Sequence, residues 1–170
     1  MEKFYVATPA GQIHGRRMGA GVIPVVLLHR TPVSSASFVR IMEYLAAAGS
    51  EAIALDTPGF GESFMPCGAP ATVDYGRWLL EALDTLGIGR FHLVAHHTGT
   101  HFAVEIASAV PERVASLSLS GILFASADER ASMRHDIANA PTIDADGRYL
   151  TETFKLMKSL FLDPEPDLVH

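Results

Sequence analysis

The chain has 170 residues, 48% of them hydrophobic and 19% charged, so we expect one compact domain that buries its core without disulfides or a structural metal. Its 13 Lys and Arg are outnumbered by 19 Asp and Glu, and the net charge of −6 argues against a nucleic-acid partner. A single cysteine, Cys67, excludes an internal disulfide and favours a reducing compartment. The longest apolar run, residues 22–28, is far shorter than the ~20 residues that span a bilayer, and the first residues lack a signal-peptide apolar region. We therefore expect a cytoplasmic protein without membrane contacts.

The N-terminal part of the chain predicts a hairpin followed by a buried strand. Residues 4–8 and 12–18 are separated by a turn at Pro9-Ala10-Gly11. The apolar run 22–28 does not alternate with polar residues, which is typical of a strand buried on both faces of a parallel sheet.

Helices and strands alternate through the next hundred residues. Further strands are predicted at residues 52–55, 91–95 and 114–123. Helices between the strands are predicted from Ser34 or Ser35 to Gly49, from a cap at Thr72 to Gly87, and from residue 99 to Pro111. This alternation predicts an α/β three-layer sandwich with a mostly parallel, doubly wound sheet.

The composition changes after Phe124, and no further strand is predicted. Residues 125–147 are polar and Ala-rich and predict one helix with loops. An amphipathic helix follows and ends at Asp163-Pro164; its apolar residues are Leu150, Phe154, Met157 and Phe161. We expect residues 125–170 to be a helical appendage to a core formed by residues 1–124.

The stretch Ala95-His96-His97-Thr98-Gly99 joins a predicted strand directly to a predicted helix. Small residues two positions to either side of His97 are typical of a strained strand–turn–helix elbow, which lifts its central side chain out of the turn. The N–H groups at the start of the following helix point to the same place. We therefore predict a positive φ at His97 and a functional role for its imidazole.

Several stretches, in order and at family spacing, resemble the α/β-hydrolase superfamily. Leu27-Leu28-His29-Arg30-Thr31-Pro32 is similar to the family's His-Gly-x-Pro oxyanion loop. Asp56-Thr57-Pro58-Gly59-Phe60-Gly61-Glu62-Ser63 is similar to its Asp-x-Pro-Gly-x-Gly-x-Ser loop. The elbow around His97 stands where the family has its nucleophile, and Pro111-Glu112-Arg113-Val114 opens the next strand as in many members. The resemblance implies an α/β-hydrolase sheet, truncated after the sixth strand, with the start of a helical cap.

The resemblance also implies roles for individual residues. His97 takes the position of the catalytic nucleophile, and the backbone N–H groups of Thr31 and Thr98 would face a developing oxyanion. The residues expected to support the pocket and its loops are His29, Arg30, Asp56 and His96.

The chain departs from the family pattern at two of these positions and at its end. His97 replaces the usual Ser, Asp or Cys, and Arg30 replaces the Gly of the oxyanion loop. Because the chain ends within the presumed cap, we expect it to lack the family's last strands, which bring the catalytic acid and the general-base histidine.

Four interpretations of His97 stay open. In the first, it is a base toward water or a nucleophile within a complete site. In the second, it binds a metal together with His29 and with His101, four residues further on, although no carboxylate motif accompanies these histidines. In the third, it is the remnant of a degenerate elbow in a binding module. In the fourth, structural interpretation, His92 and His96 are packed strand histidines and His29 only braces its loop.

The other candidates have mainly structural interpretations. Asp56 in its loop is expected to accept backbone N–H bonds and so fix the turn. Cys67 has no basic neighbour in sequence, so no reactive thiolate is predicted. The isolated Gly59-Phe60-Gly61 lacks the third glycine of a dinucleotide site. We expect no cofactor and no bound metal.

The sequence thus predicts a hydrolase of small molecules that acts on an ester or a similar carbonyl substrate. The alternatives are a non-catalytic α/β-hydrolase-like binding protein, or one half of a split or truncated enzyme. Strand 114–120 would lie at a sheet edge and contains no charge and no proline that would block pairing. We therefore predict a homo-oligomer or a complex with a complementary chain.

Overall fold

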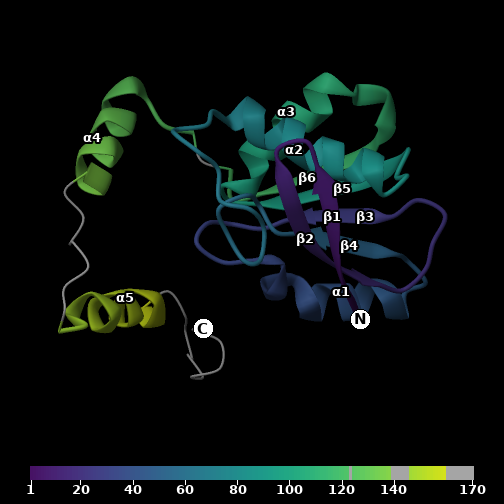
Figure 1. Cartoon of the computed structure of the whole chain (residues 1–170), viewed down its shortest axis with the longest axis horizontal. Helices are drawn as coiled ribbons and strands as arrows, with labels where there is room; N and C mark the ends of the chain where they lie inside the picture. Colours follow the sequence, from purple (N-terminus) through teal and green to yellow (C-terminus); the bar gives the residue numbers. More distant parts are fainter. Residues whose placement is uncertain (123, 139–145, 160–170) are drawn as a thin grey trace. The chain divides into compact units, whose positions relative to one another are not determined.

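The computed structural model describes residues 1–122, 124–138 and 146–159, and its core is a six-stranded sheet (Figure 1). An N-terminal hairpin of β1 (Glu2–Thr8) and β2 (Gly11–Met18) pairs as predicted. The remaining strands are β3 (Val25–Leu28), β4 (Ala52–Leu55), β5 (Phe91–His96) and β6 (Val114–Ser120). Their order in the sheet is β1-β2-β4-β3-β5-β6. β2 joins β4 antiparallel, whereas β4, β3, β5 and β6 run parallel, so the predicted mostly parallel sheet is confirmed.

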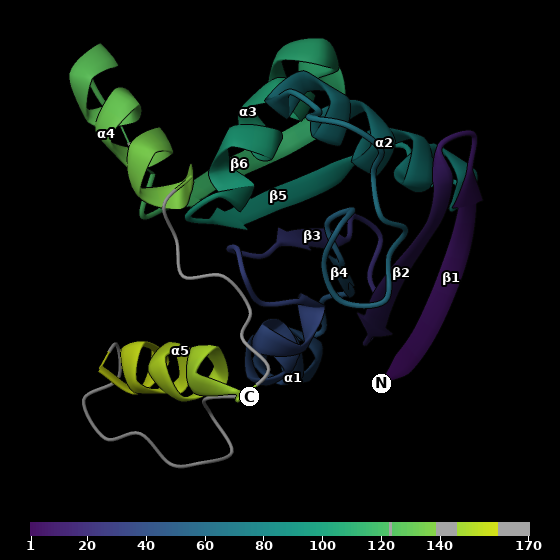
Figure 2. The ribbon, with the colours of Figure 1, turned by 60° about the vertical axis from the view of Figure 1, so that its left-hand side comes forward.

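Helices cover both faces of this sheet (Figure 1, Figure 2). A 3-10 turn, η1 (Ser35–Phe38), and α1 (Val39–Ala47) lie on one face. On the opposite face lie α2 (Thr72–Thr85) and α3 (Gly99–Ala109), and the short η2 (Pro111–Arg113) leads into β6. This arrangement is the predicted three-layer sandwich.

The core residues of β3 divide between the two helical layers. Val26 and Leu28 belong to the larger core beneath α2 and α3, whereas Leu27 packs with Phe38 and Met42 on the α1 side. Val26, Leu27 and Leu28 are each fully buried. The non-alternating apolar run therefore forms a strand buried on both faces, as expected.

Two strands are shorter than the sequence predicted. β3 begins at Val25, because Pro24 offers no N–H to a neighbouring strand and Val22 is fully exposed. β6 ends at Ser120 because Gly121 turns the chain with a φ of +65°.

The start of α2 also differs from the prediction. Thr72 is its first helical residue, and the cap is Ala71, whose N–H donates to Asp74 Oδ2 at 3.0 Å. The predicted hydroxyl cap is therefore not formed, and a carboxylate one turn into the helix instead binds the N–H of the cap residue.

The chain divides into two compact units, Met1–Leu123 and Phe124–His170, a division one residue from the predicted boundary. In the second unit the structure describes α4 (Ala127–Ala138) and α5 (Arg148–Ser159). The predicted apolar position Phe161 and the predicted helix end at Asp163-Pro164 lie outside the described residues. Of the helices described, none is long and apolar enough to cross a bilayer.

β6 is the last strand in the sheet order, and its outer side pairs with no other strand of the described chain. Its middle residues, Ser116, Leu117 and Ser118, are exposed. The predicted edge is therefore present.

Candidate active site

The loops that follow β3, β4 and β5 all leave the sheet at the carboxyl ends of parallel strands, where ligand sites of α/β proteins form. Two hydrogen bonds join them. Thr57 N–H, after β4, donates to His29 Nε2, after β3, at 2.9 Å. Thr31 N–H, in the β3 loop, donates to Thr98 Oγ1, in the turn after β5, at 2.6 Å. The three stretches singled out in the sequence are thus in direct contact.

The junction between β5 and α3 is the predicted elbow. His97 has a φ of 50° and is the one non-glycine residue with a positive φ in the described chain. Its N–H donates to Ser120 O at 2.8 Å, and its carbonyl accepts Thr100 N–H at 3.0 Å. A Cβ on Gly99 would clash with the carbonyl oxygens of Leu28 and His29, so only glycine lets α3 pass this close to β3. The prediction of a strained His97 is confirmed.

The His97 imidazole is exposed, and its nearest aromatic neighbour is His96, with ring centroids 6.4 Å apart. Within the described residues no carboxylate hydrogen-bonds to the His97 ring, so an Asp-oriented histidine of the usual triad type is not formed here. His96 is also exposed, which makes its interpretation as a packed strand histidine wrong. His92 is partly buried and contacts Ser116 Oγ through Nδ1 at 2.8 Å.

Thr31 and Thr98, the two expected oxyanion-hole residues, bind each other. Besides the bond from Thr31 N–H, Thr98 Oγ1 lies 3.1 Å from Thr31 Oγ1, as donor to acceptor. The Thr31 N–H is therefore already engaged, whereas Thr98 N–H has no acceptor among the described residues. Both side chains are partly exposed.

His29 is a bracing residue with both ring nitrogens engaged. Nε2 accepts Thr57 N–H, so Nδ1 carries the proton and donates to Arg30 O at 2.8 Å. Burial lowers the pKa of His29, and the Arg30 carbonyl and the Asp56 charge offset this only in part. A neutral ring with no free lone pair cannot bind a metal, and the described residues contain no group of three potential ligands.

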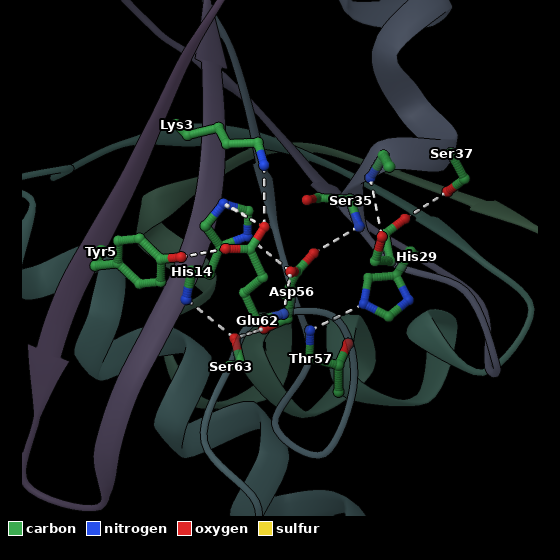
Figure 3. A network of polar contacts seen from close by, with 12 residues as sticks. Lys3, Tyr5, His14, His29, Ser35, Ser37, Asp56, Thr57, Glu62 and Ser63 are labelled. Atoms are coloured by element: carbon green, nitrogen blue, oxygen red, sulfur yellow. Dashed lines mark hydrogen bonds and ion pairs between the residues drawn. The ribbon is translucent and has the colours of Figure 1, made fainter. Parts of the chain in front are cut away.

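Asp56 is the centre of a buried polar network (Figure 3). Oδ1 accepts Ser35 N–H at 2.7 Å, while Oδ2 accepts Glu62 N–H at 2.9 Å and lies 2.7 Å from His14 Nδ1. Its carbonyl accepts the Ser63 hydroxyl at 2.7 Å. One fully buried carboxylate thus fixes its own loop, the start of η1 and strand β2.

These contacts also decide the charge of Asp56. Burial pushes the pKa of Asp56 upward, but hydrogen bonds from Ser35, Glu62 and His14 outweigh it, and the net pKa is lowered. The side chain is therefore ionised at neutral pH and accepts at both oxygens.

His14 and Glu62 were not singled out in the sequence. Both lie in this network: His14 is fully buried on β2, and its Nε2 points toward Glu62 Oε1 at 3.9 Å. Glu62 in turn accepts from the Tyr5 hydroxyl and from Lys3 Nζ. The sequence signal for this network was Gly61. A Cβ at this position would clash with the Asp56 carboxylate, so the glycine marks a loop that wraps around that side chain.

Arg30 lies next to this network, at the family's glycine position. It is partly exposed and forms no ion pair with the residues that the structure describes. Cys67 is exposed and unpaired.

Comparison with known proteins places these loops in a family. The sequence profile described as "alpha/beta hydrolase fold" matches residues 23–147, a span that contains the oxyanion-type loop, the Asp56 loop and the elbow. The chain belongs to the α/β-hydrolase family. The predicted family and fold are therefore confirmed.

Two bacterial hydrolases are among the related sequences. A 2-hydroxy-6-oxononadienedioate/2-hydroxy-6-oxononatrienedioate hydrolase of Burkholderia vietnamiensis is 40% identical over 114 residues, which cover 65% of this chain and 40% of the relative. The hydrolase of the same name from Klebsiella pneumoniae is 30% identical over 170 residues, covering 94% of this chain and 56% of the relative. The chain thus spans about half the length of the curated relatives it matches.

Solved structures agree at the level of the fold. A haloalkane dehalogenase from Agrobacterium tumefaciens superposes with a TM-score of 0.79 at 25% identity, over 98% of this chain and 60% of the dehalogenase. A second haloalkane dehalogenase, from Bradyrhizobium elkani, gives a TM-score of 0.77 at 22% identity.

Proposed function

We propose that this α/β-hydrolase chain takes part in hydrolysis of a small carbonyl compound, an ester or a ketone, and that His97 is the reacting group. The observation that supports it most directly is the exposed imidazole held at a positive φ on the elbow, where the family presents its nucleophile. The relatives are named for hydrolysis of an oxo-dioate, which supports a substrate with a ketone carbonyl.

In this proposal His97 works without a carboxylate partner. Its neutral imidazole takes a proton from a water molecule, the water oxygen attacks the carbonyl carbon, and the bond to the leaving group breaks. The imidazolium then returns its proton to the departing oxygen or carbon. In the alternative route the imidazole nitrogen attacks the carbonyl carbon, the bond to the leaving group breaks, and the leaving group takes up the ring proton. Water then hydrolyses the acyl-imidazole, which releases the acid and the free imidazole.

Replacement of His97 by alanine tests the proposal. With p-nitrophenyl acetate as the probe, we expect His97→Ala to lower kcat/KM by roughly 10²-fold or more. His92→Ala, which removes a partly buried histidine five residues before His97, is the matched control and should keep the wild-type rate. Acid quenching and mass spectrometry separate the routes, since only the nucleophilic one leaves an acetyl group on His97. Equal rates for wild type and His97→Ala would refute the role of His97.

We also propose that β6 is an association surface and that residues 125–170 form part of a cap. In the described chain the outer edge of β6 is unpaired and carries no charged residue, which favours pairing with a second copy or with a complementary chain. Light scattering at micromolar concentration should then give a mass above that of the 18.3 kDa chain.

The lone Cys67 and the acidic composition support a cytoplasmic location, which fractionation of the source cells would test.

A further inference from the structure

The contact between Thr31 and Thr98 changes which groups are free to stabilise an oxyanion at the elbow. A backbone donor in the β3 loop would serve such a site if its N–H pointed at the substrate. Here the Thr31 N–H instead donates to Thr98 Oγ1 at 2.6 Å. This donor is therefore not available to a ligand while the contact persists.

A count of protons shows what replaces it. The two threonine hydroxyls have two protons between them, and their mutual bond at 3.1 Å uses one. With Thr98 as the donor to Thr31, the Thr31 hydroxyl proton has no acceptor in the described chain. If the bond ran in the opposite sense, the Thr98 hydroxyl proton would be free instead, so one hydroxyl donor is uncommitted in either case.

We infer that the Thr31 hydroxyl, positioned by Thr98, is an oxyanion donor of this site, together with the Thr98 backbone N–H. Both groups belong to residues in direct contact, both side chains are partly exposed, and Thr98 directly follows His97. Two successive hydrogen bonds, from Thr31 N–H to Thr98 Oγ1 and from the Thr98 hydroxyl to Thr31 Oγ1, end at the Thr31 hydroxyl. They polarise this hydroxyl, because successive hydrogen bonds strengthen one another. This inference rests on the proposed function, since it assigns donors for the oxyanion of that reaction.

Two valine substitutions separate this arrangement from a backbone donor. Thr31→Val removes the free hydroxyl but keeps the backbone N–H, and with p-nitrophenyl acetate it should lower kcat by roughly 10²-fold, the usual effect of losing one oxyanion donor. Thr31→Ser keeps the hydroxyl and should retain most of the activity. Thr98→Val releases the Thr31 N–H, so a site that uses this N–H directly would become faster, whereas the hydroxyl arrangement predicts a slower enzyme.

A binding measurement that needs no turnover makes the result independent of the proposed reaction. Methylphosphonate, a tetrahedral oxyanion, is titrated while the Thr98 amide resonance is followed by NMR. We expect a shift of this resonance on binding, and a Kd about tenfold weaker in Thr31→Val, equivalent to one hydrogen bond to a charged group, but unchanged in Thr31→Ser.

The outcomes distinguish the two hypotheses. Methylphosphonate binding that needs the Thr31 hydroxyl, in a protein without esterase activity, would support the donor assignment and refute the proposed function. Esterase activity that is unchanged in Thr31→Val would support the function and overturn the assignment. Absence of methylphosphonate binding in the wild-type chain, or tighter binding in Thr98→Val, would also overturn it.

Discussion

Replacement of Asp56 by asparagine should destabilise the chain by about 2–3 kcal/mol. The carboxylate accepts from three donors, Ser35 N–H at one oxygen and Glu62 N–H and His14 Nδ1 at the other. An asparagine side chain has one oxygen and one NH₂ group, so the NH₂ group takes the place of one carboxylate oxygen and faces the donors that this oxygen bound. If the oxygen stays with Ser35, His14 can shift its proton to Nε2, which lies 3.9 Å from Glu62 Oε1, and then accept from the amide. The Glu62 N–H has no such remedy and is left without an acceptor.

The magnitude follows from this count. One buried N–H without an acceptor costs about 1–3 kcal/mol, and loss of the charge weakens the bond from Ser35 further. Urea unfolding followed by the fluorescence of Trp78, the single tryptophan, measures the change, because this ring packs edge-on against Phe64 next to the Asp56 loop. Asp74→Asn is the matched control: its carboxylate is partly exposed and its ion pair with Arg77 lies on the surface, so we expect a much smaller cost than for Asp56→Asn.

The pH dependence gives a second readout. Because the pKa of Asp56 is lowered in the folded state, unfolding takes up a proton in acid, and the stabilisation is present above about pH 4, the unfolded value. It is lost as the pH falls through the lower, folded pKa. The stability difference between wild type and Asp56→Asn should therefore narrow below pH 4. A cost for Asp56→Asn no larger than that for Asp74→Asn, or a difference that is constant with pH, would refute the stabilising role of the network.

Two further predictions concern the elbow and the edge strand. His97→Gly should be more stable than His97→Ala by about 1 kcal/mol in urea unfolding, because the positive φ penalises every residue except glycine. At His101, inside α3, the alanine variant should instead be the more stable of the two. If glycine were the more stable residue at both sites, the backbone at His97 would not be strained. Leu117→Lys, on the exposed edge of β6, should shift the light-scattering mass toward that of the monomer. Val104→Lys, on α3, is the control and should leave the mass unchanged; Val104 is 40% exposed and Leu117 is 41% exposed. Dissociation in both variants would exclude pairing through β6.

Much of the fold could be predicted because its signals are local. The apolar run that contains β3 and the small residues around His97 each report a requirement of the backbone within a few positions. The errors fell at element ends, where single residues compete. Pro24 delays β3, and Gly121 ends β6 early, although the apolar pattern continues past both.

The site was predictable only in part, because its polar contacts join residues far apart in sequence. His14 and Asp56 are 42 positions apart, and nothing in the hairpin sequence indicates that one buried histidine of β2 faces a loop after β4. The bond between Thr31 and Thr98 spans 67 positions, and it engages an N–H that a motif alone assigns to the oxyanion. Motif spacing identified the right loops, but only the folded arrangement shows which donors remain free.

The contacts of the β3 loop separate what holds the site from what acts in it. On one side the Asp56 network and the His29–Thr57 bond fix this loop to β4 through buried groups. On the other side the loop meets the elbow through two partly exposed threonine hydroxyls. Loss of a buried contact leaves a donor unsatisfied, whereas exposed hydroxyls can be solvated when their partner is lost. Substitutions at Asp56 should therefore act mainly on stability and those at Thr31 mainly on turnover, so the two groups of variants test the scaffold and the chemistry independently.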